Sequence, residues 1–256
     1  MEKKKAVRLI CSDIDGTLLG VPEATKDLRA TWDALGRGRP LLVLSTGRLL
    51  DDALSVAKEH GLPQPDFVIG GVGTMVFDAS SERRLDEYSE ILDVGWDREA
   101  VDKVVRNFPD IRPQPDEQQH PWKSSWFWMG ASAAEIEGLR SALKEAGVEA
   151  QVIYSSARDL DVLPVAANKG NALKWICGHL GIDITEAIAA GDTGNDISML
   201  TVSGVRGIAV GNAEPELLEA IEGTSVYLAR GHCAAGVLEG LIHFGVIDEI
   251  LSPAES

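Results

Sequence analysis

The sequence predicts an α/β fold: a Rossmann-like parallel sheet with helices on both faces and a smaller α+β domain inserted into it. Short apolar β-type runs alternate with segments of helical periodicity in the first 80 residues and again from residue 168 onward. Between these two parts lies a region with its own pattern of helices and strands. A length of 256 residues suits one core domain of this kind with a modest insert.

The first part of the chain supplies the first half of the core domain. Its apolar runs predict strands at residues 6–11, 41–44, 67–69 and 72–77, the last two around a Gly70-Gly71 turn. Its periodic segments predict helices at residues 24–35 and 49–60. Gly61 and Pro63 end the second of these helices.

A polar run at residues 78–84 predicts a linker, after which the insert begins. We expect the insert to span residues 81–164, between core segments 1–80 and 165–256. Its predicted elements are a helix at 97–107, a Pro-rich turn at 109–121, strands at 123–129, 150–154 and 160–163, and a helix that ends near 146. An S-x-x-E capping box, Ser132 with Glu135, opens that second helix. Strands at 187–190, 208–210 and 226–228 then complete the discontinuous core sheet.

The charge of the chain limits its partners. It has 24 Lys and Arg against 40 Asp and Glu, a formal net charge of −16. Such a field repels nucleic acids and anionic membrane surfaces, so we expect neither as a partner. An anionic substrate would need a local cation, and a metal held by some of the carboxylates would supply one.

The spacing of the cysteines and the lack of a recognisable targeting signal favour a cytoplasmic protein. The three cysteines are far apart and form no C-x-x-C pair, which suits buried thiols in a reducing compartment. The basic start, residues 1–5, is followed by an apolar stretch that ends at Ser12, too soon for a signal peptide. No segment approaches the roughly 20 apolar residues of a membrane span.

Polar residues follow the first two predicted strands. Asp13 and Asp15 leave the first strand together, and a buried pair of acids is unfavourable unless a cation or a proton lies between them. Ser45-Thr46-Gly47-Arg48 follows the second strand at a helix start, where hydroxyl and amide groups suit a phosphate. Taken singly, an Asx turn explains the first loop and a plain N-cap the second.

Two further loops in the second half carry the same kind of residue. Lys169 stands at the opening of a helix, where a positive charge is unfavourable unless an anion is near. Gly191-Asp192-Thr193-Gly194-Asn195-Asp196 places two acids and an amide after the strand at 187–190. A surface lysine and an ordinary turn would explain these two loops separately, but four such loops on one sheet favour a common site.

Together, the four loops resemble the motifs of the haloacid dehalogenase (HAD) superfamily, in order and in the right type of loop. The resemblance implies Asp13 as nucleophile, Asp15 as acid and base, and Lys169 as a catalytic cation. It implies phosphate binding by Thr46, Gly47 and Asn195. It also implies a Mg²⁺ cofactor held by Asp13, the backbone carbonyl of Asp15, Asp192 and Asp196.

The insert lies where the C2-type α+β caps of this superfamily lie. Residues 70–74, 123–127 and 159–164 resemble the sucrose-phosphate phosphatases and, more closely, the bacterial mannosylfructose-phosphate phosphatases. The resemblance implies a Mg²⁺-dependent phosphatase that acts on a disaccharide monophosphate through an aspartyl phosphate. Association with the cognate glycosyltransferase is a further expectation.

Substrate contacts in the cap are predicted from chemistry. A sugar requires donors and acceptors in fixed places, which favours Lys123 and Asp161, with Arg48 beside the phosphate loop as a further candidate. In a strand, Trp126 and Trp128 share one face and Ser125 the other. The tryptophans then either stack on a sugar or belong to the cap core.

Alternative functions stay open at this point. A broad-specificity hexose-phosphate phosphatase or a phosphomannomutase-like enzyme would use the same loops and a similar cap, and a mutase would return phosphate to the sugar. A non-catalytic module that binds a sugar phosphate is disfavoured because all the acidic residues are present.

Overall fold

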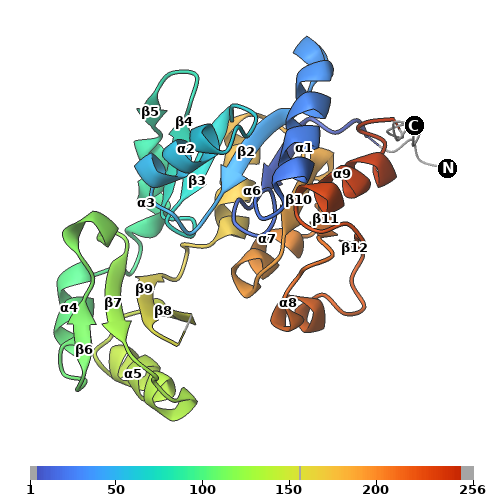
Figure 1. Cartoon of the computed structure of the whole chain (residues 1–256). Helices are drawn as coiled ribbons and strands as arrows, with labels where there is room; N and C mark the ends of the chain where they lie inside the picture. Colours follow the sequence, from blue (N-terminus) through green and yellow to red (C-terminus); the bar gives the residue numbers. More distant parts are fainter. Residues whose placement is uncertain (1–4, 156, 249–256) are drawn as a thin grey trace. The chain divides into compact units, whose positions relative to one another are not determined.

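The computed structural model describes residues 5–155 and 157–248, so residues 1–4 of the basic start lie outside the described part of the chain. The described chain forms two compact units (Figure 1). The first, the core unit, comprises the residues up to Arg84 and those from Lys169 onward. The second, the inserted unit, comprises Leu85–Asn168.

The core unit is built on an eight-stranded sheet of order β12-β11-β10-β1-β2-β3-β4-β5. Its strands are β1 (Leu9–Ser12), β2 (Leu41–Ser45), β3 (Phe67–Gly70), β4 (Met75–Asp78), β5 (Arg83–Arg84), β10 (Ala187–Gly191), β11 (Arg206–Ala209) and β12 (Tyr227–Leu228). The strands from β12 to β3 are parallel, as expected, whereas β4 and β5 are antiparallel and make the sheet mixed.

The antiparallel edge differs from the sequence prediction in two ways. The strand predicted at 72–77 begins only at Met75, because residues 71–73 adopt positive φ angles and form the turn. The polar run at 78–84 is a hairpin and not a free linker, since Arg83 and Arg84 pair with β4. The inserted unit therefore begins at Leu85.

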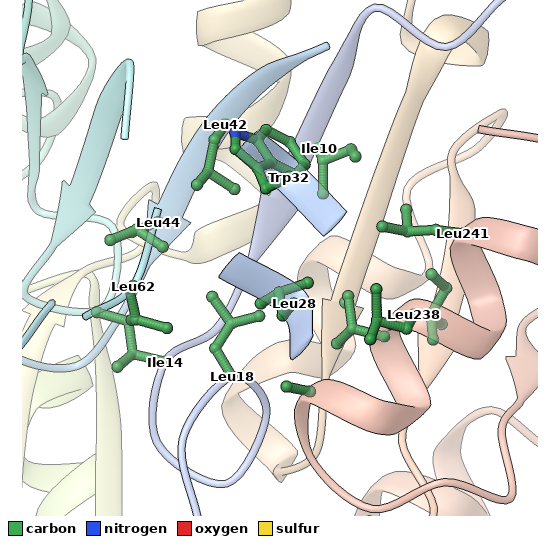
Figure 2. Close-up of a cluster of buried hydrophobic side chains, with 14 of the residues drawn as sticks. Ile10, Ile14, Leu18, Leu28, Trp32, Leu42, Leu44, Leu62, Leu238 and Leu241 are labelled. Carbon is green, nitrogen blue, oxygen red and sulfur yellow. The ribbon is translucent and has the colours of Figure 1, made fainter. Parts of the chain in front are cut away.

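Helices cover both faces of the core sheet. On one face lie α1 (Pro22–Ala34), α2 (Leu50–Glu59) and α9 (Ala234–His243), whose apolar side chains form one buried cluster with the sheet. Figure 2 shows Trp32 of α1 beside Leu42 of β2 and Ile10 of β1, and it shows Leu28 of α1 and Leu238 and Leu241 of α9 in the same cluster. α1 begins with Pro22, whose fixed φ suits the first helical position.

The side chains on the other face of the sheet are also buried. Cys11, Val43 and Ala189 point away from that cluster by strand alternation, and all three are fully buried. α6 (Lys169–His179) packs against α7 (Ile197–Leu200), which contacts β10 and β11. The core unit also contains α8 (Pro215–Ala220) and 3-10 turns at Gly36–Gly38, Ile184–Glu186 and Gly194–Asp196. A parallel sheet covered on both faces has apolar strands throughout, which is the pattern of the sequence.

The inserted unit is an antiparallel sheet of order β6-β7-β9-β8 with helices against it. Its strands are β6 (Ile111–Pro113), β7 (Ser124–Trp128), β8 (Ala150–Ser155) and β9 (Asp159–Pro164). Its helices are α3 (Ser89–Leu92), α4 (Arg98–Val105) and α5 (Ala133–Glu145), with 3-10 turns at Asp86–Tyr88 and Asp116–Gln118. β6 lies within the predicted Pro-rich turn, and Pro113 is tolerated there because β6 is an edge strand.

The predicted capping box of the inserted unit is confirmed, and of the two alternatives for the tryptophans the structure supports the cap core. Ser132 Oγ accepts a hydrogen bond from the Glu135 amide at 3.3 Å, and the Glu135 carboxylate accepts one from the Ser132 amide at 2.8 Å. Trp126 and Trp128 pack into one apolar cluster with α4 and α5, so both belong to the core of this unit. Ser125 lies on the opposite face of the sheet.

The three cysteines are free and buried. Among the described residues, no helix has both the length and the apolar character needed to cross a bilayer.

Candidate active site

The candidate site lies at the carboxyl ends of three adjacent strands. Asp13 follows β1, Thr46 follows β2 and Asp192 follows β10, and β1 pairs in parallel with both β2 and β10. The Asp13 amide donates to the Ala190 carbonyl at 2.9 Å, which continues the β1–β10 pairing into the loop. The parallel topology thus brings three of the four sequence motifs to one edge.

Lys169 joins two of these loops from the first turn of α6. Its side chain is fully buried, and Nζ donates to Asp13 Oδ1 at 2.5 Å and to Asp196 Oδ1 at 2.6 Å. The next residue, Gly170, allows α6 to approach α7 closely, because a Cβ at this position would lie 2.0 Å from the carbonyl oxygen of Ser198 in α7. A lysine that the sequence places at a helix start is therefore a central ion-pair partner of two carboxylates.

The loop after β10 is held by hydrogen bonds to its own acids. Asp196 Oδ2 accepts from the amides of Asp192 and Thr193, each at 3.0 Å. Thr17 Oγ1 donates to Asp192 Oδ1 at 2.6 Å, which links this loop to the one after β1. Gly16, at φ +82°, makes room for Asp192, since a Cβ there would lie 2.1 Å from Asp192 Oδ2. Both loops are therefore fixed relative to each other.

The buried charges of the site are unbalanced. Asp13, Asp192 and Asp196 each offer a carboxylate oxygen, and these oxygens lie within 4.8 Å of one another. Three buried carboxylates face one ammonium, that of Lys169. A divalent cation would balance the remainder, and an all-oxygen set of this kind suits Mg²⁺.

The pKa shifts follow from this burial. Burial raises the pKa of Asp13, with Asp196 and Asp192 acting in the same direction and Lys169 against them. Burial also raises the pKa of Asp192 to about 6, although the hydrogen bond from Thr17 acts to lower it. For Lys169, burial acts to lower the pKa, but the carboxylates of Asp13 and Asp196 together raise it above its usual range. This shift favours the charged ammonium form of Lys169.

Asp15 differs from the buried acids because its carboxylate is half exposed and bound by an arginine. Arg48 donates from Nε to Asp15 Oδ2 at 2.7 Å and from Nη2 to Asp15 Oδ1 at 2.9 Å. A third hydrogen bond, of 2.8 Å, joins Arg48 Nη1 to Asp52 Oδ2. Arg48 thus joins the loops after β1 and β2.

The phosphate-loop candidates are a buried hydroxyl residue and an exposed glycine. The Thr46 hydroxyl accepts a hydrogen bond from the Arg48 amide at 3.2 Å. Gly47 is exposed, and its amide has no acceptor within the described ranges 5–155 and 157–248. That amide is available to an anionic ligand.

The remaining predicted residues belong to the loop after β10 and to the inserted unit. Asn195 is exposed on the turn beside Asp196, and its side chain has no hydrogen bond to the described part of the chain. In the inserted unit, Lys123 Nζ donates to Asp161 Oδ1 at 2.7 Å and to Ser125 Oγ at 2.6 Å. Thr17 is the site residue that sequence reasoning missed, and its place in the Asp13–Asp15 loop is the signal that could have found it.

Comparisons with known proteins find similar sequences that match almost the whole chain. The family described as sucrose-6F-phosphate phosphohydrolase matches residues 6–245. A mannosylfructose-phosphate phosphatase of Agrobacterium fabrum is 42% identical over 94% of this chain and 98% of its own length. Sucrose-phosphatase 1 of Nicotiana tabacum is 35% identical over 93% of this chain, which spans 59% of that longer protein.

Solved structures agree with the fold. The sucrose-phosphatase of Synechocystis sp. PCC6803, solved with sucrose and phosphate, is 33% identical with a TM-score of 0.83, over 94% of this chain and 98% of that one. A haloacid dehalogenase-like hydrolase of Bacillus subtilis, 16% identical, aligns with a TM-score of 0.68 over 94% and 92% of the two chains, which shows the fold.

Proposed function

Because the chain belongs to the sucrose-6F-phosphate phosphohydrolase family, a family of phosphatases, we propose that it hydrolyses a disaccharide monophosphate in a Mg²⁺-dependent reaction. The substrate is of the mannosylfructose-phosphate or sucrose-phosphate type, and the products are the free sugar and phosphate. The observation that carries the proposal is the buried Lys169 ammonium between Asp13 and Asp196.

Mg²⁺ would be held by the side chains of Asp13, Asp192 and Asp196 and by the backbone carbonyl of Asp15. When bound, it would neutralise charge on the phosphoryl oxygens and on the nucleophile. Thr17 would orient the Asp192 carboxylate through its 2.6 Å hydrogen bond.

The chemistry takes two steps. In the first, a carboxylate oxygen of Asp13 bonds to phosphorus, the bond from phosphorus to the sugar oxygen breaks, and the protonated form of Asp15 gives that oxygen its proton and becomes a carboxylate. In the second, Asp15 takes a proton from water, whose oxygen bonds to phosphorus and releases phosphate from Asp13. Thr46, the Gly47 amide and Asn195 bind phosphoryl oxygens.

The inserted unit would act as a C2-type cap that selects the sugar. Lys123 is 4% exposed, and its ammonium is fixed by Asp161 and Ser125. The side chains of Lys123, Ser125 and Asp161 lie on the face of the β7–β9 sheet opposite the packed tryptophans, where together they offer a hydrogen-bond donor and acceptors. We assign them to sugar hydroxyls. Association with the glycosyltransferase that makes the substrate stays a prediction.

The test is phosphate release from mannosylfructose phosphate, sucrose phosphate and simple hexose phosphates, with Mg²⁺ and with chelator. We expect strong preference for one disaccharide phosphate, lost with chelator. Weak activity spread over the hexose phosphates would overturn the disaccharide assignment. A phosphate yield well below the sugar phosphate consumed would indicate a mutase.

A matched pair of variants tests the nucleophile. Asp13→Asn should abolish turnover, whereas Asp33→Asn should retain it, because Asp33 pairs with Arg29 on the surface of α1. Wild-type turnover in Asp13→Asn would show that Asp13 is not the nucleophile.

A second pair of variants tests the sugar contacts in the inserted unit. Lys123→Met and Asp161→Asn should raise KM for the disaccharide phosphate and leave the binding of inorganic phosphate unchanged.

A further inference from the structure

The turn between β3 and β4 contains a strained residue. Residues 71, 72 and 73 have φ angles of +57°, +59° and +87°. Two of them are glycines, which adopt such angles freely, but Val72 is β-branched and adopts them only at a cost in free energy. Its side chain is 7% exposed, so the conformation is held by its surroundings.

This turn binds the loop after β2 on both sides of Gly47. The Val72 amide donates to the Thr46 carbonyl at 3.1 Å, and the Gly71 amide donates to the Arg48 carbonyl at 2.8 Å. The side chain of Val72 also approaches Gly47, since a Cβ at Gly47 would lie 3.8 Å from Val72 Cγ2. The two loops are thus fastened by backbone and by packing.

The bond from Val72 determines where the Gly47 amide points. In a trans peptide the C=O and the following N–H point in opposite directions. Because the Thr46 carbonyl points at Val72, the Gly47 N–H of the same peptide points away from the turn. This is the amide that has no acceptor in the described ranges, and it lies in the loop after β2, which pairs with β1, the strand that Asp13 follows.

We propose that Val72 is a positioning residue of the phosphate site. Its surroundings hold Val72 in this conformation, where the branched side chain leaves the backbone less freedom than a glycine would have. The Val72 N–H therefore fixes the Thr46–Gly47 peptide, and the Gly47 amide is oriented before a phosphoryl group arrives. A donor oriented in advance needs no reorganisation when the ligand binds. The inference rests on the proposed function, because it assigns the Gly47 amide to phosphoryl oxygens.

A purely structural turn would behave differently. Glycine adopts φ near +60° without strain, so Val72→Gly relieves strain while it frees the backbone of the turn. If the turn served stability alone, activity would follow the melting temperature. If Val72 orients the Gly47 amide, phosphate affinity falls even where the melting temperature is maintained.

The experiment compares Val72→Gly with Val72→Ala and with Glu82→Gly. Val72→Ala loses the same packing atoms beyond Cβ but keeps a restricted backbone. Glu82, at φ +52° in the β4–β5 turn, is a control for the relief of strain away from the site. The measurements are the dissociation constant of inorganic phosphate in the presence of Mg²⁺, kcat and KM for the best substrate, and the melting temperature.

We expect Val72→Gly to weaken phosphate binding about tenfold, a modest effect because the donor is misaligned and not deleted; deletion of such a donor typically lowers kcat by roughly 10²–10³-fold. kcat/KM should fall by a similar factor, Val72→Ala should lie closer to wild type, and Glu82→Gly should match wild type. Wild-type phosphate affinity in Val72→Gly, or equal losses in Val72→Gly and Val72→Ala, would overturn the inference.

The two proposals can fail separately. A wild-type protein that binds phosphate but hydrolyses no disaccharide phosphate would contradict the proposed function, and the comparison of phosphate affinities would still decide the role of Val72. Conversely, full disaccharide-phosphate hydrolysis with wild-type phosphate affinity in Val72→Gly would contradict the role of Val72 alone.

Discussion

Arg48 binds Asp15 through two parallel hydrogen bonds, from Nε at 2.7 Å and from Nη2 at 2.9 Å. The planar guanidinium fixes both carboxylate oxygens, which a lysine ammonium cannot do. Asp52 holds the same guanidinium from the first turn of α2. In the proposed mechanism, Arg48 therefore orients the acid and base in addition to any contact with substrate.

Arg48→Lys should lower kcat/KM about tenfold, because it keeps the charge but loses the paired hydrogen bonds that orient Asp15. Steady-state kinetics on the best substrate give the measurement. Arg29→Lys is the control, since Arg29 pairs with Asp33 on the exposed side of α1. Equal kinetics for Arg48→Lys and the control would argue against an orienting role.

Thr17→Val should weaken Mg²⁺ binding about tenfold, because a residue that orients a metal ligand typically contributes a factor of about 10–100 in affinity. The substitution keeps the shape of the side chain and removes the hydroxyl that donates to Asp192. Activity titrated against Mg²⁺ should recover at high concentration. Thr25→Val, which removes a buried hydroxyl bound to the Leu18 carbonyl, should keep the wild-type Mg²⁺ dependence.

Mg²⁺ should raise the melting temperature more at about pH 7.5 than at about pH 5. The pKa of Asp192 is raised by burial to about 6, against about 3.9 in an unfolded chain. The metal-free fold therefore binds this proton more tightly than the unfolded chain, and it loses that stability as the pH rises from about 4 to about 6. Mg²⁺ competes with protons for the carboxylate, so its stabilisation appears above this range.

Thermal denaturation at both pH values, with and without Mg²⁺, measures this effect. Asp192→Asn serves as the control, because its side-chain amide does not titrate. In this variant, most of the Mg²⁺-induced rise in melting temperature should be lost at both pH values. A Mg²⁺-induced shift of the same size at both pH values in the wild type would contradict the assignment of Asp192 as a metal ligand.

Gly170→Ala should destabilise the protein by about 1–3 kcal/mol, because its methyl group would meet the backbone of α7 where α6 approaches it. Gly178→Ala, in the same helix but with open space around it, should stabilise by about 0.5–1 kcal/mol. Denaturant unfolding measures both. A Gly170→Ala variant as stable as Gly178→Ala would show that the close approach of α6 to α7 is not needed.

Much of the fold follows from local patterns. The core strands and the helices α1, α2 and α5 lie within a few residues of their predicted positions, because apolar periodicity and capping residues act over one or two turns of chain. The prediction fails at β6, where three residues pair along the edge of a sheet despite the prolines around them. It also fails at 72–74, where a valine adopts the conformation of a glycine.

The sequence by itself determined the four polar loops, their order and their residue types, since each loop directly follows or opens a recognisable element. Tertiary structure alone decided that Lys169 lies buried between Asp13, 156 positions away, and Asp196. It also decided that Arg48 binds Asp15 and that Val72 fastens the loop at Thr46. These contacts depend on which strands are neighbours and how closely helices approach the sheet, and such long-range pairing leaves no periodic signal in the chain.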